Sequence, residues 1–95
     1  MPFDHMIPRP FTPNAIRMYA PIASGVYGIS NAREWIYIGM ADSIQDALLA
    51  HLKDLHASLM KRLPTGFVFE ICEASRRPVR QDRLVLEYGP ACNRH

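Results

Sequence analysis

The chain is short of cysteine, of long apolar runs and of charge imbalance, and each shortage excludes a class of protein. Its 95 residues contain two cysteines, Cys72 and Cys92, which form no CxxC pair and predict no disulfide framework. No apolar run approaches the roughly 20 residues that cross a bilayer, so no membrane partner is expected. Segment 1–8 has an acid where a secretory signal carries positive charge. We therefore expect one cytoplasmic domain.

The charge balance gives only a local signal. The net charge of +2, from 11 Lys+Arg and 9 Asp+Glu, is too even to identify a nucleic-acid-binding protein by itself. Segment 76–83, however, holds one acid, Asp82, and four arginines: Arg76, Arg77, Arg80 and Arg83. This segment predicts either a basic patch or a solvated helix face.

Prolines are concentrated at the N-terminus, where residues 1–23 hold five of the eight. Such a segment favours an extended arm. A short helix over 12–20 is expected within it, with Thr12 as N-cap and Pro13 at the first helical position. We place the folded domain at 24–95.

Two strands are expected directly after the arm. Apolar and aromatic residues alternate around Tyr27 and again around Tyr37, and the segment 31–33 can turn the chain between them. A loop of that length places Tyr27 opposite Tyr37 and Gly25 opposite Gly39. Facing residues of an antiparallel pair project to the same side, so both tyrosines are expected on one face.

The rest of the chain alternates helix, strand and helix. A long helix is expected over 43–62, capped by Asp42 or Ser43, with Ala47 and His51 toward the sheet. A third strand over 67–72 and a helix over 78–88 follow, and Gln81 begins the inward face of that last helix. The fold class is α+β: a small three-stranded antiparallel sheet with flanking helices, in the order β-β-α-β-α.

The tripeptides Gly25–Tyr27 and Tyr37–Gly39 resemble the paired signature of the GIY-YIG nucleases, a family that cuts DNA phosphodiester bonds. The likeness extends to Asn93, about three-quarters of the chain. The other positions that fit the family pattern are Ile44, Leu48, His51, Leu52, Leu84, Val85 and Pro90. The resemblance implies a GIY-YIG-like fold.

The same resemblance assigns site residues and also exposes two departures. It implies that Tyr27, Tyr37, His51 and Asn93 are the remaining catalytic positions. It places Ala47 where the family has its catalytic arginine and Gln81 where the family has its metal-binding glutamate. No metal is therefore expected at Gln81, and Mg²⁺ or Mn²⁺ is expected only if the protein is active.

Three functions remain open at this point. The first is a domain that has lost most or all cleavage activity and binds nucleic acid or a protein. Its candidate phosphate contacts are Arg33, Arg76, Arg77, Arg80 and Arg83. The second is an active metal-dependent DNA endonuclease with a rearranged site, in which Glu70 or Asp82 supplies the carboxylate. The third is a structural protein-interaction domain. We expect the first, with cleavage activity lost or strongly impaired, and leave open whether the protein is an enzyme.

Overall fold

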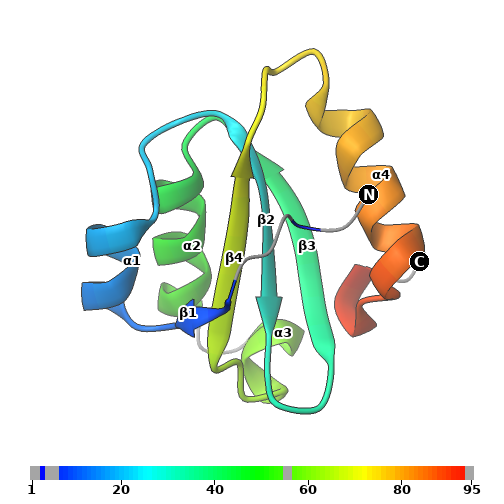
Figure 1. Cartoon of the computed structure of the whole chain (residues 1–95). Helices are drawn as coiled ribbons and strands as arrows, with labels where there is room; N and C mark the ends of the chain where they lie inside the picture. Colours follow the sequence, from blue (N-terminus) through cyan, green and yellow to red (C-terminus); the bar gives the residue numbers. More distant parts are fainter. Residues whose placement is uncertain (1–2, 4–6, 55–56, 94–95) are drawn as a thin grey trace.

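A computed structural model describes residue 3, residues 7–54 and residues 57–93; residues 94–95, the end of the predicted domain, lie outside this range. Helices lie on both sides of one sheet, with α1 and α2 on one side and α4 with η1 on the other (Figure 1). The described elements are β1 (Arg9–Pro10), α1 (Pro13–Tyr19), β2 (Gly25–Ser30), β3 (Trp35–Ala41), α2 (Ile44–Lys53), α3 (Ser58–Lys61), β4 (Gly66–Ile71), α4 (Arg77–Tyr88) and η1 (Ala91–Asn93).

The predicted α+β class is confirmed, but the sheet has four strands among the described residues instead of three. They are antiparallel, in the order β1-β4-β2-β3. The extra strand, β1, is two residues long and pairs with Gly66 and Phe67. A strand this short gives no alternating pattern. Its Pro10 lies on the outermost strand, where a missing N–H costs little.

The predicted hairpin register was wrong by two residues. Tyr27 faces Gly39, and Tyr37 faces Ile29. The register also shifts between Ile29 and Ser30, which pairs with Trp35, so Ile36 is an extra residue on β3. Because a shift by two residues preserves the side on which a residue projects, Tyr27 and Tyr37 still share one face.

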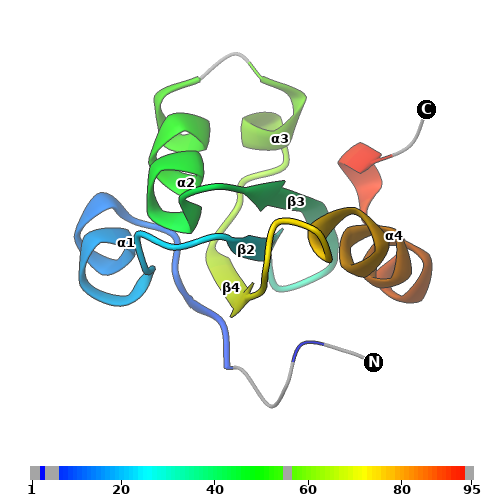
Figure 2. The same ribbon diagram turned by 90° about the horizontal axis from the view of Figure 1, so that it is seen from above.

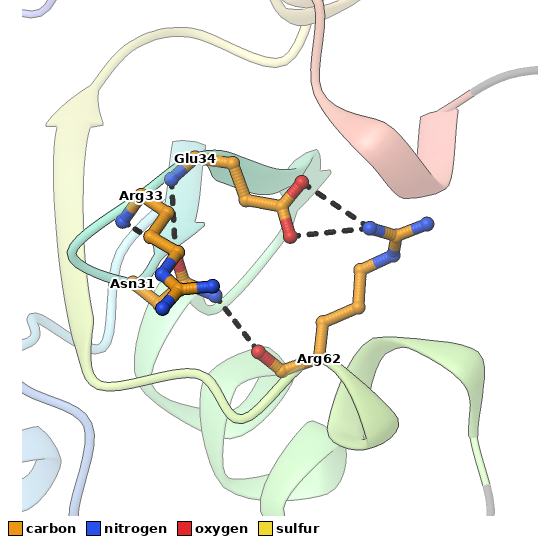
Figure 3. A network of polar contacts seen from close by, with 4 residues as sticks. All are labelled: Asn31, Arg33, Glu34 and Arg62. Atoms are coloured by element: carbon orange, nitrogen blue, oxygen red, sulfur yellow. Dashed lines mark hydrogen bonds and ion pairs between the residues drawn. The ribbon is translucent and has the colours of Figure 1, made fainter.

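The register differs because the loop is one residue longer than predicted and the extra residue Ile36 on β3 adds the second. Asn31 closes it by donating its N–H to the Glu34 carbonyl, and its Oδ1 accepts from the N–H groups of Arg33 and Glu34. Its Nδ2 donates to the Arg62 carbonyl, and the Arg62 guanidinium binds the Glu34 carboxylate (Figure 3). These contacts fix the hairpin to the end of α3.

The helix predicted over 43–62 is two helices. Ser43 caps α2 as expected, since its Oγ accepts from the N–H of Asp46. The first helix ends at Lys53, and α3 spans Ser58–Lys61 and buries Leu59. Apolar residues recur through both pieces, so periodicity alone could not reveal the interruption.

Each face of the sheet has its own core, and Figure 2 shows the helices from above. The α1 and α2 side buries Phe11, Ile16, Ala20, Tyr27, Ile29, Ile36, Ile44, Leu48, Leu59 and Phe67. The α4 side buries Phe3, Val26, Ile38, Val68 and Leu84. No described helix is long and apolar enough to span a membrane.

Residues of the proline-rich segment contribute to both cores. Thr12 caps α1 by accepting from the N–H of Ala15, and α1 buries Ile16. Phe3 is 6% exposed and stacks on Trp35 and Tyr88, with ring centroids 5.9 Å apart in each pair. Part of this segment is therefore packed against the sheet instead of projecting as a free arm.

A candidate site along the edge of the sheet

Three of the predicted site residues form one cluster of rings. The hydroxyl of Tyr27 lies 2.8 Å from Nε2 of His51, which α2 holds against the sheet. The Tyr37 ring centroid lies 5.2 Å from that of His51 and 6.1 Å from that of Tyr27. The shared face expected for the two tyrosines is thus observed, with His51 between helix and strands.

Burial sets the charge state of this cluster. Tyr27 is 4% exposed, and burial, followed by the nearby Tyr37, raises its pKa far above the ordinary value. Burial also lowers the pKa of His51, although Asp54 partly opposes this shift. Near neutral pH the pair is therefore a phenol hydrogen-bonded to a neutral imidazole. Neither group carries charge.

The signature glycines are explained by close packing. A Cβ at Gly39 would lie 2.5 Å from the Tyr27 hydroxyl and 2.7 Å from Cε2 of Tyr37. A Cβ at Gly25 would overlap the carbonyl oxygen of Glu70 and lie 2.7 Å from Cδ1 of Ile44. Glycine at these two positions lets the rings and α2 approach the strands.

The fourth predicted residue, Asn93, holds the edge of the sheet. Its Oδ1 accepts from the N–H of Ile38 at 2.7 Å, and its Nδ2 donates to the Ile38 carbonyl at 2.9 Å. Because β3 is the last strand in the sheet, the side-chain amide occupies the place of a neighbouring strand at this residue.

Gln81 binds the same carbonyl. Its Nε2 donates to the Ile38 oxygen at 3.0 Å. A carbonyl can only accept, so the amide nitrogen must face it, and a carboxylate at this position could not make the bond. The position that the family resemblance assigns to a metal-binding glutamate thus supports β3.

A cleft of about 620 Å³ lies beside these residues, lined by Tyr37, Gln81, Asp82, Val85, Leu86, Cys92 and Asn93. Asp82 lines this cleft together with Leu86, so it is nearer the candidate site than its offset from Gln81 on the helix suggested. Glu70, the other candidate carboxylate, is bound by Arg80 through two hydrogen bonds. Sequence reasoning could not anticipate that pair, because it joins β4 to α4.

The donors around the cleft are a poor match for a divalent metal. The described residues contain no group of three or more His, Cys, Asp or Glu side chains that could hold one. Gln81 offers a single neutral oxygen, whereas Mg²⁺ in proteins is usually held by carboxylates and phosphates. Ala47 is partly buried against the core on the α2 side and supplies no charge.

The five arginines proposed as phosphate contacts are not gathered in one place. Arg33 lies in the hairpin loop, at the opposite end of the sheet from the start of α4 (Figure 1). Arg77 pairs with Asp42 at 2.7 Å, and Arg80 pairs with Glu70. Arg76, Arg80 and Arg83 line a shallow hollow of about 400 Å³ together with Ser75 and Val79.

Comparisons with models of protein families and with curated proteins find no match. Similar solved structures include point mutants of the GIY-YIG N-terminal endonuclease domain of UvrC from Thermotoga maritima, bound to the catalytic divalent cation. One has a TM-score of 0.70 at 22% identity and covers 84% of this chain and 96% of that one. A magnesium-bound structure of the same domain has a TM-score of 0.66 at 22% identity, covering 79% and 91%. The chain therefore has the GIY-YIG endonuclease fold.

Proposed function

We propose that this protein is a GIY-YIG-like domain that binds nucleic acid and cleaves it weakly or not at all. The observation that supports this most directly is the hydrogen bond from Gln81 to the Ile38 carbonyl. It makes the side chain at the expected metal position a donor to the protein backbone, a role that a carboxylate cannot fill.

Cleavage of a phosphodiester needs positive charge where negative charge develops. A divalent metal normally supplies part of it, and an arginine that stabilises a phosphoryl transition state contributes about 10³ to 10⁵ in rate. Ala47 and Gln81 supply neither charge. Because burial keeps Tyr27 and His51 neutral near pH 7, the ring cluster cannot supply the missing positive charge.

Nucleic-acid binding makes smaller demands than cleavage. Phosphate contacts need only arginine side chains within reach of the nucleic-acid backbone. Three arginines at the start of α4 line one shallow hollow: Arg76, Arg80 and Arg83. The solved structures of similar fold are endonuclease domains, and this favours nucleic acid as the ligand over other classes of molecule.

Two assays on the same preparation test this function. Fluorescence anisotropy with labelled duplex and branched DNA should show binding that weakens as salt increases, because phosphate contacts release counterions. Plasmid nicking with Mg²⁺ or Mn²⁺ should show little or no product above background. Absence of salt-dependent binding would instead favour a structural protein-interaction domain, and robust nicking abolished by Tyr27→Phe would contradict the proposal.

A second candidate, an active endonuclease with a displaced carboxylate, is favoured by one observation. Asp82 is exposed and lines the same cleft as Tyr37 and Gln81. If Asp82 held the metal, Asp82→Asn would abolish Mn²⁺-dependent nicking, whereas Glu87→Gln on the same helix would not. Calorimetry that detects no Mn²⁺ binding in the presence of DNA would exclude this candidate.

A further inference from the structure

Two neighbouring arginines of α4 are buried equally but paired differently. The side chains of Arg77 and Arg80 are each 16% exposed. Arg80 binds Glu70 through Nε at 2.7 Å and Nη2 at 2.8 Å, and the Glu70 side chain is 30% exposed. Arg77 binds Asp42 through Nη1 at 2.7 Å, and the Asp42 side chain is 94% exposed.

The Arg77 pair is also incomplete. Its Nε is buried and has no hydrogen-bond partner. An unpaired buried N–H disfavours the folded state, so such a group calls for a physical explanation. The acid at the other end gains little from the contact, because an ion pair with an exposed carboxylate is screened by water. Burial thus fixes the Arg77 side chain, whereas the carboxylate of Asp42 is held weakly.

The position of the pair connects it with the candidate site. Asp42 follows β3 directly and precedes Ser43, the N-cap of α2. Arg77 precedes Gln81 by one turn, so the two side chains lie on the same face of α4. The pair therefore joins the turn before α2, the helix that carries Ala47, to α4, which carries Gln81.

We propose that Arg77 is a preformed receptor for a phosphate group of the nucleic-acid backbone and that Asp42 occupies it as an internal competitor. This inference rests on the proposed nucleic-acid-binding function and names one contact within it. A guanidinium binds two oxygens of a phosphate in parallel, which a single Nη1 bond to Asp42 does not achieve. Because Asp42 is almost fully exposed, an incoming phosphate can displace it without moving the core.

Removing the competitor should strengthen binding. Anisotropy titrations of duplex DNA compare Asp42→Asn with Asp46→Asn, an exposed acid in the first turn of α2 whose loss changes the net charge equally. We expect Asp42→Asn to bind about two to five times more tightly than Asp46→Asn, the factor that corresponds to a partly exposed ion pair. Equal affinities would overturn the role of Asp42.

The arginine is tested in the same titrations. Arg77→Gln should lower the slope of log affinity against log salt by about one unit, as expected for the loss of a single phosphate contact. Arg77→Lys keeps the charge but not the paired donors. In the Asp42→Asn background it should therefore remove the gain in affinity for DNA. A gain that persists with lysine would show that Arg77 is not the receptor.

A measurement without DNA separates this inference from the proposed function. The Nε–H resonance of Arg77, assigned by NMR with Arg77→Lys, is followed while inorganic phosphate is added. We expect it to shift in the wild-type protein, and at lower phosphate concentration in Asp42→Asn. If DNA does not bind but this resonance shifts, the proposed function fails, and Arg77 remains a phosphate site without a role in nucleic-acid binding. If DNA binds and the resonance does not respond, the inference fails alone.

Discussion

The side chains of Gln81 and Asn93 are both bound to one residue of the edge strand, and this limits what either can do in the cleft. Asn93 bonds the N–H and the carbonyl of Ile38, and Gln81 bonds the carbonyl again. Two amides that are used in this way stabilise a strand edge. They have few atoms left for a ligand.

The two hydrogen bonds of Asn93 to Ile38 can be tested with a substitution whose charge depends on pH. Asn93→Asp keeps an acceptor for the Ile38 N–H but loses the donor to the carbonyl and places a carboxylate oxygen against it. We expect a loss of about 1–2 kcal/mol in the free energy of unfolding at pH 7. Denaturant titrations should show that the loss diminishes as the carboxyl is protonated near pH 4. A pH-independent loss would contradict the two-bond contact.

The His51 environment gives a second residue-scale prediction, for stability against pH. Because burial lowers its pKa, the unfolded chain binds a proton that the folded chain does not, between the folded pKa and about 6.5. The stability due to neutral His51 is therefore complete above about pH 6.5 and decreases as the pH falls. His51→Gln should lose this dependence.

The comparison of wild type and His51→Gln removes contributions from other groups. In urea unfolding at pH 7.5 and 5.5, the wild type should lose more stability between the two values than the variant does. Equal losses would mean that burial does not lower the pKa of His51.

At the scale of elements, the N-terminal segment is part of the fold. Phe3 packs against Trp35 of β3 and Tyr88 of α4, whose rings also contact each other, and its N–H donates to the Tyr88 hydroxyl at 3.0 Å. Phe3→Ala should therefore lower the free energy of unfolding by about 3 kcal/mol, the usual cost of truncating a buried phenylalanine. Ile7→Ala, at a side chain that is 83% exposed, should change it little. Similar values for both variants would show that the segment does not pack as described.

Sequence patterns within short segments predicted the helices and strands that depend mainly on local sequence. The hairpin, the strand at Gly66–Ile71 and the helix at Arg77–Tyr88 were placed within one or two residues. The last helix ends at Gly89, whose positive φ of 58° is a conformation that glycine adopts readily. Side-chain alternation also predicted the shared face of Tyr27 and Tyr37.

The features that were missed depend on tertiary contacts. The hairpin register depends on the Asn31 loop and on the extra residue Ile36, and β1 depends on pairing with β4. In the site, the bond from Gln81 to Ile38 and the pairing of Arg77 with Asp42 join residues 43 and 35 positions apart. No spacing rule covers such contacts.

At the scale of the whole molecule, the fold agrees with that of a nuclease domain, whereas the charge of the candidate site does not suit cleavage. The fold is that of a GIY-YIG endonuclease domain, and the aromatic cluster, the two glycines and Asn93 are in position. Under the proposed function, the missing charges belong at Ala47, one turn before His51 on α2, and at Gln81 on α4. If that proposal is right, the scaffold should cleave DNA when those two groups are supplied.

The most direct test is plasmid nicking by the double variant Ala47→Arg with Gln81→Glu, run beside the wild type and each single variant with Mn²⁺. We expect little or no nicking by the wild type and by the single variants. For the double variant we expect a rate at least about 10³ times higher, the lower range of what an arginine contributes to phosphoryl transfer. Nicking by the wild type that equals or exceeds that of the double variant would contradict the account.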